Sequence, residues 1–160
     1  MMKRIVTAAV AGTFLLGGLA VGTAHAARPL ASSVRETVTL HALHGSRVAG
    51  AAVFAYSSRT NITTVALRVT GLKAMTVHPA HIHAGASCAA NGPVIYSFHP
   101  LGGSMMTTTE AGAAGVLRAS TSFRGSFVGK KFYINVHTGP TLTTKAQFAP
   151  LACGVLAPMM

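Results

Sequence analysis

Beyond its N-terminal segment, the chain alternates apolar and polar residues over short stretches. Between residues 61 and 70, for example, Val65, Leu67 and Val69 alternate with polar neighbours such as Arg68. A period of two places the apolar side chains on one face of a β-strand. The segments predicted as strands are 37–44, 48–56, 61–70, 76–84, 116–123, 131–138 and 146–156. Turn-forming residues separate them, the stretch 85–115 is predicted to be irregular, and no segment has a helical period. This pattern of seven or eight antiparallel strands predicts an all-β sandwich or barrel.

The N-terminal segment has the organisation of an export signal. Two basic residues precede an apolar run over residues 5–21, and the small-x-small sequence Ala-His-Ala occupies positions 24–26. This order is typical of a secretory signal peptide, and the apolar run is short for a membrane span. We therefore predict a signal peptide over residues 1–26 and a single domain over residues 27–160, with no membrane span in the mature chain. The mature protein is expected to be secreted, periplasmic or associated with the cell wall.

Three histidines occupy strand positions suited to metal binding. In an extended strand, His81 and His83 point to one side and Ile82 to the other. The same parity places His137 on the face opposite Ile134. We expect the aliphatic residues to form the core and the histidines to lie outside it. Three imidazoles held by two rigid strands could bind a copper or zinc ion.

Other histidines have weaker claims to a role in the site. His99 lies in the long irregular stretch and is a candidate fourth ligand. His78 lies three residues before His81 and therefore faces the core side, so we interpret it as a structural histidine. His41 and His44, on or just after the first strand, are expected at the surface.

The two cysteines, Cys88 and Cys153, favour a disulfide in an exported protein. The alternative is a copper thiolate site, which would need one of these soft ligands near the histidines.

Charge and composition exclude several classes of function. Without the two basic residues of the signal, eleven basic residues stand against Glu36 and Glu110, a formal charge of +9, and the chain contains no aspartate. This excess favours anionic surfaces or small anionic substrates, and its alternative interpretation is a charge that only maintains solubility. Nucleic acid is not an expected partner, because the basic residues are scattered and aromatic residues are few. A carboxylate acid–base pair is hard to build from two glutamates, and nucleophile-elbow and phosphate-loop motifs are absent.

The histidine and cysteine segments resemble two related families. His78-Pro-Ala-His81-Ile-His83, the following Cys88-Ala-Ala-Asn-Gly-Pro93, and Leu151-Ala-Cys153-Gly-Val-Leu156 are similar to copper-ligand and cysteine segments of copper/zinc superoxide dismutases. Ala80-His-Ile-His-Ala-Gly85 and Phe132-Tyr-Ile-Asn-Val-His-Thr138 resemble motifs of the CHRD domain, as does Asn-Gly-Pro-Val-Ile at 91–95. Both resemblances imply an immunoglobulin-like Greek-key β-sandwich or barrel.

The dismutase resemblance also implies specific site residues and specific losses. It implies copper ligands at His81, His83 and His137, and an intrasubunit disulfide between Cys88 and Cys153. Val94 stands where that family has its zinc-bridging histidine, and Pro150 stands where it has the arginine that guides superoxide. Without any aspartate the family's zinc site cannot be assembled, so the resemblance implies copper without zinc.

Two functional hypotheses follow. The first is an exported copper-binding protein resembling superoxide dismutase, which, if it is an enzyme, acts on superoxide or another small anion. The alternative is a non-catalytic CHRD-type module that binds a protein or the cell envelope. Convergence of the three imidazoles and an assay of superoxide removal separate the two.

Overall fold

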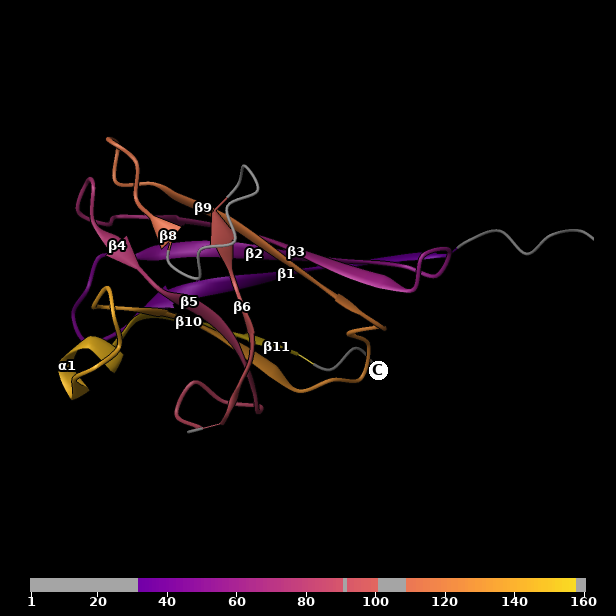
Figure 1. The fold of residues 1–160 in the computed structure, drawn as a ribbon. Coiled ribbons are helices and arrows are strands. Elements are labelled where there is room, and N and C mark those ends of the chain that lie inside the picture. Colours follow the sequence, from indigo (N-terminus) through magenta and orange to yellow (C-terminus); the bar gives the residue numbers. More distant parts are fainter. Residues whose placement is uncertain (1–31, 91, 101–108, 158–160) are drawn as a thin grey trace, which may run out of the picture.

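The computed structural model describes residues 32–90, 92–100 and 109–157, which are almost entirely β-structure (Figure 1). The predicted signal peptide lies outside the described residues. Among these residues, no helix is long and apolar enough to cross a membrane. The predicted all-β sandwich or barrel is confirmed.

Nine of the strands form one antiparallel sheet with the order β6-β5-β10-β11-β1-β2-β3-β9-β7. The longer strands are β1 (Ser33–Ala42), β2 (Ala49–Ser57), β3 (Ile62–Thr70), β5 (Ala80–Ala84), β6 (Val94–Ser97), β9 (Leu117–Arg124), β10 (Phe132–His137) and β11 (Pro150–Leu156). The strand β7 (His99–Pro100) is short, and β4 (Val77–His78) pairs with β8 (Thr109–Glu110) in a separate two-stranded sheet.

Three local predictions are corrected by the structure. The predicted strand 76–84 divides at Pro79 into β4 and β5, as expected of a residue without a backbone N–H to donate. The predicted strand 146–156 begins only at Pro150, because a capping box between Thr144 and Gln147 starts the short helix α1 (Lys145–Phe148). The stretch predicted to be irregular contains β6, β7 and β8.

The large sheet folds into two layers with the main hydrophobic core between them. One layer contains β1, β2, β3, β9 and β7, and the other contains β6, β5, β10 and β11 (Figure 1). Phe54 and Val65 of the first layer and Ile82 and Ile134 of the second are fully buried in this core. Burial of such side chains stabilises the fold by roughly 1.5–3 kcal/mol each.

The layers meet at two edges. At one edge, β1 pairs with β11 only at its end, where His41 lies opposite Cys153. At the other, the Tyr96 ring of β6 stacks on Phe123 of β9 with ring centroids 4.2 Å apart. The sheet is therefore nearly closed on itself.

A disulfide joins Cys88 to Cys153, 65 residues apart, which confirms the predicted pairing. Cys88 lies in the loop after β5, and Cys153 lies on β11, on the outer face of its layer. The bond therefore holds this loop against the outer face of the second layer.

We predict that the double substitution Cys88→Ala/Cys153→Ala lowers the free energy of unfolding by about 4 kcal/mol, because the bond closes a long loop in the unfolded chain. Urea unfolding of the variant and of the oxidised and reduced protein measures this. The reduced protein is expected to behave like the variant. A loss below about 1 kcal/mol would contradict the prediction that the loop constraint dominates.

Candidate metal centre

The candidate site lies on the outer face of β5 and β10. These strands pair with Tyr133 opposite His83 and Asn135 opposite His81. Alternation along β10 directs Ile134 to the core and Tyr133, Asn135 and His137 to the other face, as the sequence predicted. The histidines thus share a face that the main core does not use.

The histidines lie outside the main core, as predicted, but this outer face is itself covered. His81 and His83 are each 7% exposed, and His137 is 4% exposed. The loop after β5 packs over His83, and the segment that ends in α1 packs over His137 through Phe148. Strand parity predicted the correct face, but it carries no information about the loops that fold over that face.

The three histidines converge on one point. Each offers a ring nitrogen, and these nitrogens all lie within 4.8 Å of one another. The ring centroids of His81 and His137 are 5.2 Å apart, and His83 lies 5.9 Å from each of the other two rings. Among the residues that the structure describes, this is the one such cluster of potential metal-binding side chains.

Backbone carbonyls determine which nitrogens of two rings carry a proton. Nδ1 of His83 lies 3.0 Å from the Gly92 carbonyl oxygen, and Nδ1 of His137 lies 2.8 Å from the Phe148 carbonyl oxygen. A carbonyl oxygen only accepts, so each Nδ1 must donate, and in the neutral ring Nε2 then carries the lone pair. Such a hydrogen bond also sets the orientation of a metal-binding ring.

One ring nitrogen of each clustered histidine is buried without a hydrogen-bond partner. His81 Nδ1, His83 Nε2 and His137 Nε2 are buried and unpaired among the described residues. A buried polar atom without a partner costs about 1–3 kcal/mol. A metal ion coordinated by the three lone pairs would remove this cost, so the residues present fit a metal.

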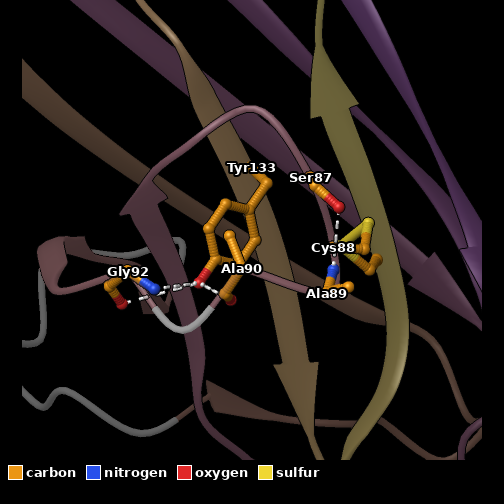
Figure 2. Close-up of a disulfide and its surroundings, with 7 residues drawn as sticks. Ser87, Cys88, Ala89, Ala90, Gly92 and Tyr133 are labelled. Atoms are coloured by element: carbon orange, nitrogen blue, oxygen red, sulfur yellow. Dashed lines mark hydrogen bonds between the residues drawn. A yellow bond between two sulfur atoms is a disulfide. The ribbon is translucent and has the colours of Figure 1, made fainter.

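Tyr133 contacts both the histidine cluster and the loop that covers it. Its ring stacks on His83 with centroids 4.8 Å apart. Its hydroxyl donates to the Ala90 carbonyl over 2.7 Å and accepts from the Gly92 amide over 3.0 Å (Figure 2). The disulfide at Cys88 holds the same loop (Figure 2). The Gly92 carbonyl that orients His83 is thus fixed on both sides.

His78 has the structural role proposed for it. Its Nδ1 donates to the His137 carbonyl over 2.9 Å, and its Nε2 lies 2.7 Å from the Thr76 hydroxyl. Both ring nitrogens therefore have partners, and the residue is buried. His78 ties β4 to the backbone of the strand that carries His137.

The remaining residues singled out in the sequence lie outside the cluster. His99 lies on β7, opposite Ser120 of β9, and is not one of the three converging histidines. Val94 pairs with His83, and Pro150 pairs with His137. The two positions that the dismutase resemblance expects to be histidine and arginine are thus next to the site, and neither has a ligating or charged side chain.

Three supporting groups escaped the sequence analysis. The stacking of Tyr133 could have been inferred, because its parity places it on the histidine face. The carbonyls of Gly92 and Phe148 could not, because every residue has a carbonyl and its direction depends on the folded loop. In addition, the sequence pattern predicts a strand at Phe148, whereas the structure places this residue in α1.

The surroundings of His81 and His137 favour the neutral form of these two rings. Burial, reinforced by the proximity of His137 and His83, lowers the pKa of His81 from 6.5 to about 4. Burial also lowers the pKa of His137, opposed by its hydrogen bond to Phe148 and aided by His83. Neutral imidazoles have the free lone pairs that a metal requires.

We predict that the metal-free protein loses stability as the pH falls from 6.5 to 4. In this interval the unfolded chain protonates the histidine at position 81 and the folded protein does not, so protons favour unfolding. Urea midpoints measured across the interval test this. His81→Gln should flatten the dependence, whereas His41→Gln, at an exposed position, should not. A wild-type midpoint that does not change with pH would refute the prediction.

Comparison with known proteins places the chain in a family. The family model of the CHRD domain matches residues 30–141, well over half of the chain. The match includes all three converging histidines and ends before β11. No curated protein matches the chain. Of the two resemblances in the sequence, family evidence supports the second and not the first. The chain belongs to the CHRD domain family.

Proposed function

We propose that this protein is an exported CHRD-type binding module that holds a copper ion at His81, His83 and His137 without turning over a substrate. The observation that carries the proposal is the convergence of three buried, unpartnered ring nitrogens within 4.8 Å. Two of the rings are already oriented by backbone carbonyls, so little order has to be gained when an ion binds.

The donor set favours copper. Neutral imidazole suits copper, zinc, iron and nickel, and copper(II) stands highest among the divalent ions in general affinity. Oxygen-preferring ions such as magnesium and calcium are disfavoured, because no carboxylate belongs to the cluster.

The positions beside the cluster support a non-catalytic role. Val94 and Pro150 place no proton donor and no cation next to His83 and His137. An enzyme acting on a small anion gains both rate and capture from such groups. Their absence at these two positions favours a metal that stabilises the module.

Superoxide dismutation is the second candidate. It is favoured by one feature: three protein ligands leave a coordination position open, as in catalytic metal sites. Copper bound there would supply a one-electron redox couple. In this case His81, His83 and His137 would hold the ion and exclude most water from it through their burial.

The disulfide supports export. Such bonds form and persist in oxidising compartments, outside the cytosol. A secreted, periplasmic or wall-associated location agrees with the signal peptide predicted over residues 1–26.

We predict that copper(II) stabilises the chelator-treated protein. At a free copper concentration about a hundredfold above the dissociation constant, the free energy of unfolding should rise by about 2.7 kcal/mol. Chemical unfolding with and without metal measures the increase, with zinc as a second ion. His81→Gln should abolish most of it, and His41→Gln should preserve it. Equal stabilisation of wild type and His81→Gln would contradict the assignment of the site.

We predict that the copper-loaded protein removes superoxide no faster than free copper at the same concentration, because Val94 and Pro150, the residues paired with His83 and His137, supply neither a cation nor a proton donor. Kinetics of superoxide decay, compared among wild type, His81→Ala and His137→Ala, test this. Rates well above free copper that are lost in both variants would overturn the non-catalytic proposal in favour of the second candidate.

A further inference from the structure

The outer face of β1, β2, β3 and β9 carries exposed and half-buried side chains and no acidic residue. These strands lie side by side on the layer opposite the histidine site (Figure 1). The central row of paired residues on this face consists of Thr37, Val53, Ala66 and Ser120. These side chains are small, and we call this row the floor of the face. We call the whole surface the arginine face, after the residues at its ends.

Arginines lie at both ends of this floor. Arg35 lies at one end, in the row with Ala55, and Arg68 and Arg118 lie at the other, in the row with Thr39. All three are exposed. Strand spacing and rise place Arg35 roughly 16 Å from Arg68.

The pair Arg68 and Arg118 is unfavourable for the protein alone. The two are direct partners on β3 and β9, and like charges in this position destabilise a sheet. Neither glutamate lies on this face. Glu36 shares the inward parity of Val38 on β1, and Glu110 lies on β8 in the separate small sheet. An external anion would relieve the repulsion.

The chemistry of the face points to an acidic polymer. Charges roughly 16 Å apart match a ligand with repeated negative groups better than a single small anion. Guanidinium groups pair strongly with carboxylates, and the hydroxyls of residues such as Thr37 and Ser120 suit a hydrated ligand. The floor has no aromatic ring on which a base could stack. The large exposed apolar side chain that these four strands carry, Ile62, lies at the end of β3 beyond the row of Arg35 and stands alone, unlike the apolar patch that a membrane or protein partner would need.

We propose that the arginine face binds an extended acidic polysaccharide that bears carboxylates. The surface gives the binding module a partner chemistry, and in that respect the inference rests on the proposed function. It is independent of the metal, because the histidine cluster lies on the outer face of the other layer.

The test measures binding of the purified protein to polygalacturonate, with neutral dextran as the control polymer. Arg68→Gln/Arg118→Gln should weaken binding about tenfold or more, because both guanidinium contacts at one end are lost. Lys130→Gln/Lys131→Gln changes the net charge equally at exposed positions away from this face and should have little effect. The arginine variant should remain folded, since removal of a like-charge pair does not destabilise a sheet.

Several results would overturn the proposal. Equal weakening by the two double variants would show attraction by net charge alone. Equal binding to dextran, or tighter binding to polyphosphate or to vesicles rich in phosphatidylglycerol, would assign another partner. Loss of polygalacturonate binding in folded His81→Gln would move the site away from this face. Retained binding in that variant, together with lost copper stabilisation, separates this proposal from the metal proposal.

Discussion

The covered outer face of β5, β10 and β11 depends on the bond between Cys88 and Cys153. A sheet face that carries His81, His83 and Asn135 would ordinarily be left in water, where each polar atom finds a partner. The disulfide instead holds a loop over it, and the Tyr133 hydroxyl holds the same loop through Ala90 and Gly92. The protein therefore has a polar buried layer outside its apolar core.

Burial of this layer determines its chemistry. Once the histidines are removed from water, the charged form of the ring is disfavoured and the pKa values of His81 and His137 fall. The nearby backbone carbonyls accept the Nδ1 protons of His83 and His137, whose Nε2 atoms stay buried without a partner, as does Nδ1 of His81. The unpaired buried nitrogens carry a desolvation cost that a coordinated metal ion would remove. The same burial limits access, which fits an ion that stays bound better than a site of rapid exchange.

The two outer faces of the molecule carry different polar groups. The histidine face is covered, and its three histidines come from two paired strands of one layer. The opposite face is open and basic, and it owes its character to strand parity, which turns Glu36 inward and Arg35 outward. A chain with so few carboxylates leaves its arginines without internal counter-charges, which is the reason we propose an anionic ligand for this face.

Much of the fold and part of the site could be predicted from the sequence. The alternation along 61–70 and 131–138 predicted strands and the core face of β10. It also predicted that His81 and His83 share one side of their strand, because side-chain direction in a strand is a local property. An even pair of cysteines in a chain with an export signal was enough to expect their bond. Local errors arose where two signals overlapped. The capping box of Thr144 and Gln147 overlaps the start of segment 146–156, whose apolar residues predicted a strand.

Only the tertiary structure decided that the histidines are buried, that His99 stays on β7, and which nitrogen each clustered ring presents. These features depend on contacts between segments distant in sequence, such as His137 with Phe148 and Cys88 with Cys153. The order of residues determines the face on which a strand places a side chain. What covers that face depends on how loops close over it, and their closure depends on contacts between distant residues, such as the hydrogen bond from His137 to the Phe148 carbonyl, that no local pattern encodes.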